Sequence, residues 1–289
     1  MKKNKIASDS LTMTLTDGRQ LGFAEYGIPT GQPILYFHGL PGSRLEAKHL
    51  ETFALSNHYR LIGIDRPGMG LSSIDPHRSI LSWVDDVEAL ANYLGIEKFS
   101  IIGHSGGAPF IAACAYKIPH RLHGAAIVAG MAPLEHPDAT ASLSQGQRII
   151  NSAIKIMPWI ATGMVKLISI MLRKPNMVKQ MMKQMPEVDQ VVFRDGAFIE
   201  TTLEAFRNGV AGASQEVQLT LKPWGFNVED IQCPVTIWQG DLDKQAPAGH
   251  AKLYAKLIPN AQLTFFKNEG HLSVLINHGE AILRSISNH

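Results

Sequence analysis

The sequence lacks several features that mark common classes of protein. It has only two cysteines, Cys114 and Cys233, which are too few and too far apart for a disulfide-stabilised secreted domain. Neither lies in a C-x-x-C or histidine-neighbour context, so we expect reduced, buried thiols and no metal site. No uninterrupted apolar run reaches about eighteen residues, which argues against a membrane-spanning helix. The basic start, Met1–Lys5, is followed by polar residues, so a secretory signal is not indicated and a cytoplasmic location is expected.

The net charge is also small. The formal net charge is +2 and no Lys/Arg block occurs, which excludes an electrostatic footprint for nucleic acid. Hydrophobic residues make up 45% of the 289-residue chain and charged residues 18%, as is usual for a soluble enzyme. A chain of this length can bury a sizeable core.

Short β-rich runs alternate with helical segments along most of the chain. The runs lie at 33–37, 59–65, 99–103, 124–129, 234–239 and 262–266, and helix-like segments lie at 44–56, 79–94, 106–117, 249–258 and 272–286. This alternation predicts an α/β fold with a parallel sheet and right-handed crossovers. An antiparallel hairpin, 11–16 and 19–26 around the two-residue turn Asp17-Gly18, is expected before it.

The alternation stops between about 134 and 224, where the periodicity is helical and no strand is convincing. Because the alternation resumes at 234, this stretch is interpreted as an insertion. We therefore expect a core built from residues 1–133 and 225–289, with 134–224 as a helical cap.

The residues from Gly103 to Gly107 read G-x-S-x-G between a strand and a helix. That context is the one in which such a motif exposes its serine on a strained turn at the edge of the sheet, beside a helix N-terminus. Ser105 is therefore the candidate nucleophile.

A serine hydroxyl needs a base and an acid that orients the base. Among twelve histidines, only His271 follows a late strand directly and precedes the final helix. His250 and His278 are interpreted as solvated surface residues, and His104 as structural. Asp243 is favoured as the acid over Asp241, which is closer to the strand end and is expected to bridge or cap the loop.

An oxyanion hole requires two backbone N–H groups directed at the developing charge. Gly106 follows the serine and can supply one. The loop 38–43 can supply the other through Leu40, because the next residue, Pro41, has no N–H.

Together these motifs resemble the α/β-hydrolase superfamily, specifically its cap-bearing serine hydrolases of the esterase/lipase type. The matching segments occur in the expected order, at 38–42, 65–73, 103–107, 240–243 and 270–271. The resemblance implies a mostly parallel eight-stranded sheet with helices on both faces and a helical cap. It also implies that Asp65 has a structural and not a catalytic role.

The haloalkane dehalogenases and epoxide hydrolases of this superfamily have an aspartate where this chain has Ser105. They therefore do not fit the sequence. Proline iminopeptidases resemble the chain at the 38–42 loop, but they typically have glycine at the position of Leu40 and tryptophan at that of Gly106. Glu200 and Glu204 are the candidates for holding a substrate amine as those enzymes do, although both read more simply as one exposed helix face.

The insertion has no Asp or Glu from Ala139 to Pro186, yet seven Lys or Arg residues, and seven of the eleven methionines lie between 157 and 185. One hypothesis is an apolar lid over an apolar acyl substrate, lined by Met157, Trp159, Ile160, Met164, Leu167, Ile168 and Met171. Packing within the cap itself is the alternative, and contact with an anionic membrane surface is a third.

The sequence thus predicts an esterase-like hydrolase working through an acyl-enzyme on a small, apolar substrate, without metal or organic cofactor. Aminopeptidase, acyltransferase and carbon–carbon bond hydrolase activities on the same three residues remain alternatives. A ligand-binding or signalling protein that keeps the fold is the alternative outside enzymes. The sequence does not indicate an oligomeric state.

Overall fold

The central sheet follows the alternation of strands and helices. A computed structural model describes residues 6–287, so the basic segment 1–5 lies outside it. Within the described residues, strands pair in the order β1-β2-β4-β3-β5-β6-β7-β8. Their bounds are β1 Ile6–Thr14, β2 Gln20–Gly27, β3 Gln32–Phe37, β4 Tyr59–Ile64, β5 Phe99–His104, β6 Leu122–Val128, β7 Val235–Gly240 and β8 Ala261–Phe266. Only the β1–β2 and β2–β4 pairs are antiparallel. The mostly parallel eight-stranded sheet is confirmed.

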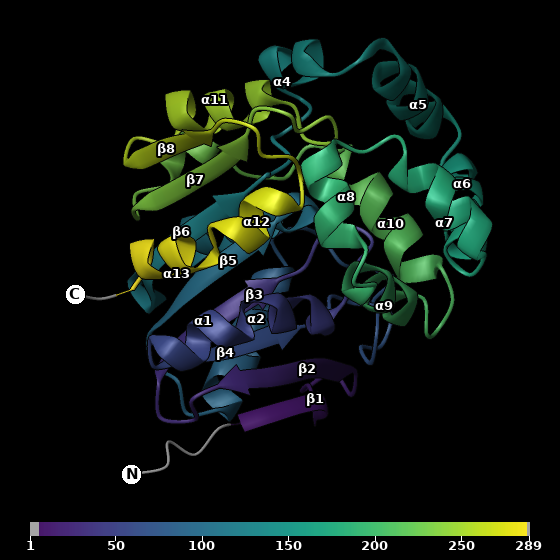
Figure 1. Ribbon diagram of the computed structural model, residues 1–289. Coiled ribbons are helices and arrows are strands. Elements are labelled where there is room, and N and C mark those ends of the chain that lie inside the picture. Colours follow the sequence, from purple (N-terminus) through teal and green to yellow (C-terminus); the bar gives the residue numbers. More distant parts are fainter. Residues whose placement is uncertain (1–5, 288–289) are drawn as a thin grey trace.

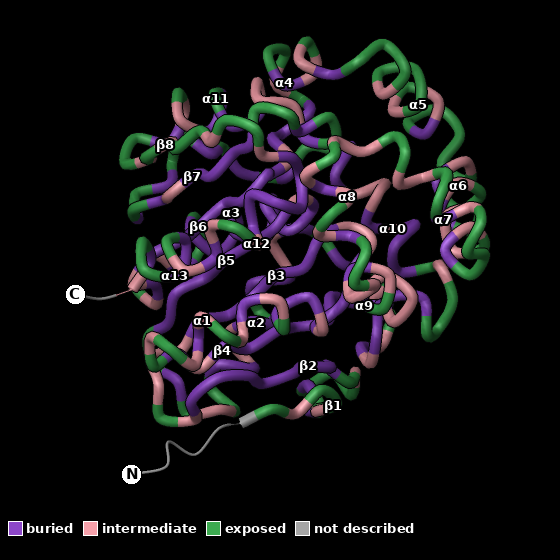
Figure 2. Tube along the Cα trace, viewed as in Figure 1, coloured by how far each residue is buried: buried purple, intermediate pink, exposed green. Residues whose placement is uncertain are grey.

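Helices cover both faces of the sheet (Figure 1). Side chains of a strand alternate between its two faces. In β3, Leu35 and Phe37 accordingly join one hydrophobic core, and Ile34 and Tyr36 the other. The first core includes α2 (Trp83–Tyr93), α3 (Ala108–Lys117) and α11 (Ala248–Leu257). The second includes α1 (Glu51–Ser56), α12 (Ser273–Asn277) and α13 (Gly279–Ser285). Figure 2 shows the inner strands, β2 to β7, as largely buried, whereas the edge strands β1 and β8 are mostly intermediate or exposed.

Two elements differ from expectation. The β1–β2 connection spans residues 15–19 and not two residues, and Gly18 has a φ of +88° within it. The expected final helix is broken at His278 into α12 and α13. The break lets Gly279 approach α1 closely, since a Cβ there would lie 2.8 Å from the Phe53 ring.

The helical insertion lies between β6 and β7 and forms the teal and green group beside the sheet in Figure 1. It contains α4 Pro137–Ser142, α5 Gln145–Ile156, α6 Trp159–Leu172, α7 Pro175–Met182, α8 Glu187–Phe193, α9 Ala197–Ala205 and α10 Ala211–Thr220. The exact limits of core and cap remain a prediction.

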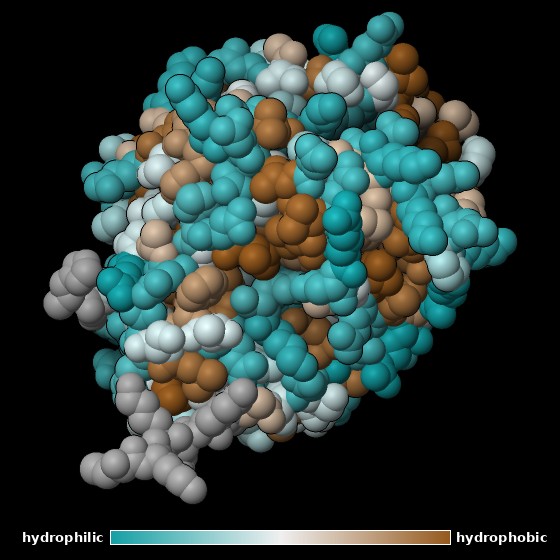
Figure 3. All heavy atoms as spheres, viewed as in Figure 1, coloured by the Kyte–Doolittle hydropathy of each residue, from teal (hydrophilic) through white to brown (hydrophobic). Residues whose placement is uncertain are grey.

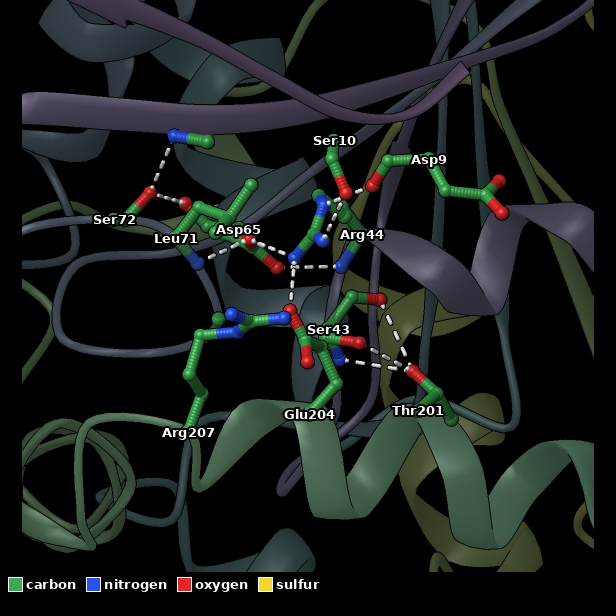
Figure 4. Close-up of polar contacts among 12 residues, drawn as sticks. Asp9, Ser10, Ser43, Arg44, Asp65, Leu71, Ser72, Thr201, Glu204 and Arg207 are labelled. Atoms are coloured by element: carbon green, nitrogen blue, oxygen red, sulfur yellow. Dashed lines mark hydrogen bonds and ion pairs between the residues drawn. The ribbon is translucent and has the colours of Figure 1, made fainter. Parts of the chain in front are cut away.

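Buried ion pairs fasten the cap to the core. Arg44, which follows the loop after β3, lies 2.8 Å from both Asp65 and Glu204 of α9, and Thr201 of α9 contacts Ser43 (Figure 4). Glu204 is therefore held by arginine, and its interpretation as part of an exposed helix face is wrong. Asp65 accepts hydrogen bonds from the amide and side chain of Arg44, which gives it a structural role.

A second buried cluster lies under α10. Its Glu216 is completely buried between Arg66 and Arg78, at 2.6 and 2.8 Å. The two cationic partners, together with good hydrogen-bond geometry, offset the desolvation of this carboxylate. The cap is thus held to the core at two separate points.

Candidate active site

The loops that carry the candidate residues meet at one edge of the sheet. Parallel strands end at the same edge, and β3, β5, β7 and β8 are all parallel to one another. The loop that contains Leu40 follows β3, and Ser105 follows β5. Asp243 follows β7 and His271 follows β8. The topology therefore brings together residues that are far apart in sequence.

Ser105 lies at the sharp turn from β5 into the helix. Its φ is +53°, an unusual conformation for a residue with a side chain, and such strain is typical of functional turns. Gly106 is packed tightly against the loop after β3: a Cβ on it would lie 2.5 Å from the Cβ and 3.2 Å from the amide nitrogen of Leu40. The turn and the loop can approach this closely only because residue 106 is glycine.

Asp243, and not Asp241, is the carboxylate that reaches His271. Its Oδ2 lies 2.8 Å from the Nδ1 of His271, while Asp241 accepts a hydrogen bond from the Asn268 amide across the loop. Burial alone would raise the pKa of Asp243, but the charge and hydrogen bond of His271 and the amides of residues 245 and 246 hold it below its ordinary value. An ionised acceptor at Nδ1 requires a proton there, which leaves Nε2 free as a base.

Ser105, His271 and Leu40 line one cavity of about 240 Å³. Cap side chains supply most of its apolar wall: Ile168, Leu172, Met181, Met185, Phe193 and Phe198. An adjoining pocket of about 320 Å³ shares Met181, Met185 and His271 with it. The sequence predicts seven apolar residues on the side of the lid that faces the substrate. Only Ile168 of these borders the cavity. Trp159 and Leu167 instead face solvent, with 69% and 54% exposure.

The backbone of His271 is held at both of its polar groups. Its amide donates to the Asp189 carboxylate at 2.8 Å, and the same carboxylate accepts from the amides of Leu272 and Ser273 at 3.0 and 2.9 Å. The His271 carbonyl lies 3.0 Å from Nε2 of His104. Asp189 belongs to the cap helix α8 and is 1% exposed. The cap thus contributes directly to the placement of His271.

His104 pairs with a second buried carboxylate. Its Nδ1 lies 2.7 Å from Glu46, and its Nε2 faces the His271 carbonyl, so both ring nitrogens face acceptors. Both nitrogens must therefore donate, which requires the imidazolium form. Burial disfavours that form, but the hydrogen bond and charge of Glu46 outweigh it and raise the pKa of His104. Burial likewise opposes ionisation of Glu46, yet its bond with His104 lowers the pKa of Glu46 to about 2.

The loop after β3 is fixed by buried groups on both sides. Arg66 donates to the carbonyls of His38 and Gly39 at 2.6 and 3.0 Å, and the Gly39 amide donates to Glu46 at 3.0 Å. Burial, and then the charge of Arg66, lower the pKa of His38 to about 3, so its ring is neutral. The loop that contains Leu40 is thereby held in one position.

Two other histidines are more buried than their positions in the sequence predict. His250 is 1% exposed and lies 3.3 Å from the Ala132 amide and 3.2 Å from the Ala139 carbonyl, so it bridges the start of the cap and is not a surface residue. His278 is only partly exposed and stacks on Phe266. Asp189 and Glu46 were missed, because nothing in the local sequence indicates a partner so far along the chain.

A family model described as "alpha/beta hydrolase fold" matches residues 32–166. Solved structures that the chain resembles over nearly its whole length include an esterase from Thermogutta terrifontis, at 23% identity, TM-score 0.64 and coverage of 98% of this chain and 96% of that one. An esterase from Exiguobacterium antarcticum aligns at 17% identity and TM-score 0.69, over 96% and 97%. The chain has the α/β-hydrolase fold. At these identities, the structural likeness shows the fold alone.

Curated relatives match this chain over shorter stretches. A proline iminopeptidase of Xanthomonas citri is 30% identical over 109 residues, which is 36% of this chain and 34% of the relative. A non-heme chloroperoxidase of Streptomyces lividans is 31% identical over 125 residues, 43% of this chain and 45% of the relative. The chain therefore matches less than half the length of either. Within residues 6–287, no group of three or more His, Cys, Asp or Glu is arranged to hold a metal ion.

Proposed function

We propose that this α/β hydrolase cleaves carboxylic esters with an apolar acyl or alcohol part, through an acyl-enzyme. The observation that carries the proposal is the cavity lined by Ser105 and His271, whose wall is largely apolar and comes from the cap. Such a wall favours substrates held by apolar burial and offers few groups for recognising a charge.

Ser105 attacks the ester carbonyl while Nε2 of His271 accepts its proton. Asp243 orients the ring and stabilises the imidazolium that forms. The amides of Leu40 and Gly106 bind the oxyanion of the tetrahedral intermediate. His271 then protonates the departing alcohol, and water activated by the same base releases the acid.

Aminopeptidase action is the rival suggested by the names of several curated relatives, which are proline iminopeptidases. An enzyme of that type needs a carboxylate free to pair with the substrate's ammonium group. The only carboxylate bordering the described cavity is that of Glu46, which already accepts from Tyr36, Gly39 and His104. Glu204 is bonded to Arg44, and Glu200 borders other pockets. These contacts support the ester over the amine-bearing peptide.

The test combines active-site labelling with a substrate panel. A fluorophosphonate probe is expected to label the wild type and not Ser105→Ala, and the variant should lose about 10⁴–10⁶ in kcat. Across p-nitrophenyl esters of increasing chain length and L-proline p-nitroanilide, kcat/KM should be higher for the esters. Loss of less than tenfold in Ser105→Ala would show that Ser105 is not the nucleophile. A preference for the anilide would establish the aminopeptidase instead, and folded protein that neither labels nor turns over would indicate a binding protein.

A further inference from the structure

Helix α6 is apolar on both of its faces. Ala161, Val165 and Leu172 are buried toward the protein, and Leu172 borders the Ser105 cavity. On the opposite face, Trp159 and Leu167 are exposed, and only one of its 14 residues, a lysine, is charged. A helix that is hydrophobic all round is normally covered on all sides. The outer face of α6 is therefore a surface that no other part of residues 6–287 covers.

Exposed apolar side chains also occur on α5, which packs against α6. Ile149 and Ile156, seven residues apart and so on one side of the helix, are 61% and 79% exposed. We define the outer cap face as the exposed apolar residues of α5, α6 and their connection: Ile149, Ile150, Ile156, Met157, Trp159, Leu167 and Ile170. Figure 3 shows brown atoms gathered at the upper right, where Figure 1 places α5. Single exposed apolar residues are ordinary, but a contiguous set marks an interaction site.

The charge around this face has one sign. From Ala139 to Pro186 the chain has seven Lys or Arg residues and no Asp or Glu. All seven basic residues are exposed: Arg148, Lys155, Lys166, Arg173, Lys174, Lys179 and Lys183. Their positive charge is not neutralised within the stretch, so it remains available to an anionic partner.

We propose that the outer cap face docks on the surface of an anionic lipid bilayer. Exposed Trp and Ile side chains flanked by lysines are the combination by which interfacial helices enter the headgroup region. The 14 residues of α6 are too few to cross the bilayer core, which takes about 20. In the described part of the chain, no helix is long and apolar enough to span a membrane.

The charge also argues against a second copy as the occupant. Two copies meeting through this face would bring two unneutralised basic surfaces together, which repel. Docking would place the lipid surface against α6, whose inner residues Ile168 and Leu172 border the cavity. The helix would then separate the bilayer from the Ser105 site by a single layer of structure. Binding is measured without turnover, so the proposal stands apart from the proposed function.

The first experiment is co-sedimentation of the full chain with phosphatidylcholine vesicles, with and without 30% phosphatidylglycerol. We expect binding to the anionic vesicles that falls at least tenfold between about 50 and 500 mM salt, and little binding to the neutral ones. The double variant Ile156→Ser/Trp159→Ser should weaken binding at least tenfold. Tyr93→Ser, which removes a 62% exposed aromatic residue from α2, is the matched control and should bind as the wild type does.

Tryptophan fluorescence provides a second, local readout. Trp83, Trp224 and Trp238 are 2%, 3% and 8% exposed, whereas Trp159 is 69% exposed. Anionic vesicles should shift the wild-type emission to the blue and protect it from acrylamide, and neither change should occur in Trp159→Phe. Thermal melting of each variant establishes that it is folded.

The charge is tested separately by Lys155→Gln/Lys166→Gln, with Lys98→Gln/Lys222→Gln as the equal-charge control. Only the first pair should reduce binding. Absence of binding to anionic vesicles, or equal binding by the wild type and Ile156→Ser/Trp159→Ser, would overturn the proposal. So would a dimer in sedimentation velocity that the same double variant converts to monomer, since a second copy would then be the occupant.

Discussion

Asp189→Asn tests the placement of His271 by the cap. The Asp189 carboxylate accepts from three successive backbone amides, with one oxygen on His271 and the other on Leu272 and Ser273. An asparagine can retain one oxygen only. If that oxygen keeps the two bonds to Leu272 and Ser273, the amide NH₂ faces the His271 N–H, and a buried donor loses its acceptor.

The expected magnitude follows from these bonds. A hydrogen bond to a charged group contributes about 1.5–3 kcal/mol, and a buried donor left unpaired costs about 1–3 kcal/mol. We therefore expect Asp189→Asn to lower the free energy of unfolding by about 2–3 kcal/mol. Because reacting groups displaced by about 1 Å lose about 10²-fold in rate, we expect kcat to fall by about 10–100-fold.

The assay uses a short p-nitrophenyl ester, which does not extend into the adjoining pocket that Asp189 borders. The value of kcat is normalised to active sites titrated with the fluorophosphonate. KM should change by less than about threefold, since Asp189 does not line the Ser105 cavity. Glu187→Gln removes an exposed carboxylate from the same helix and serves as the control, with kcat unchanged.

Two results would refute the reasoning. If Asp189→Asn melts earlier but retains kcat within twofold, the carboxylate stabilises the fold without placing His271. If Glu187→Gln lowers kcat to the same extent, the effect comes from the charge of the cap and not from the three hydrogen bonds.

Three further predictions follow from other contacts. The pKa of His104 is raised in the folded state, so its stabilising contribution is present below about 6.5, the ordinary value, and is lost as pH rises through the folded value. In urea unfolding, the stability of the wild type should decline above neutral pH, and that of Glu46→Gln should decline less. Equal declines would contradict a protonated His104 ring. Gly106→Ala places a Cβ 2.5 Å from that of Leu40 and should lower kcat/KM by about 10²–10³-fold, whereas kinetics within twofold of the wild type would exclude Leu40 from the oxyanion hole. Arg44→Met leaves the carboxylates of Asp65 and Glu204 without their buried cation. It should lower the free energy of unfolding, measured by urea titration, by about 3–5 kcal/mol. A loss of less than about 1 kcal/mol would count against the buried ion pair.

Much of the fold was predictable because its signals are local. Continuous apolar runs mark strands buried on both faces, and glycine-rich motifs mark the sharp turns that follow them. The order of Ser105, Asp243 and His271 along the chain already implied that they meet at one edge of the sheet. This holds because the carboxyl ends of parallel strands lie at the same edge of the sheet.

Predictions failed where a residue's environment comes from distant segments. His250 was expected at the surface because it begins a helix, but the start of the cap covers it. Glu204 was expected on an exposed face, but Arg44 lies 160 positions earlier in the chain and binds it. The hypothesis that seven apolar residues of the insertion line the lid holds at the cavity only for Ile168. Because α6 is apolar all round, periodicity could not say which of its faces points inward.

The sequence by itself determined the α/β architecture, the position of the insertion and the three candidate residues, because each depends on local pattern and order. Only the tertiary structure decided what surrounds them. It placed Asp189 at the backbone amide of His271 and His104 at the backbone carbonyl, and it left Trp159 exposed. Hydrogen-bond partners and burial depend on the folding of distant segments against one another, which no local pattern records.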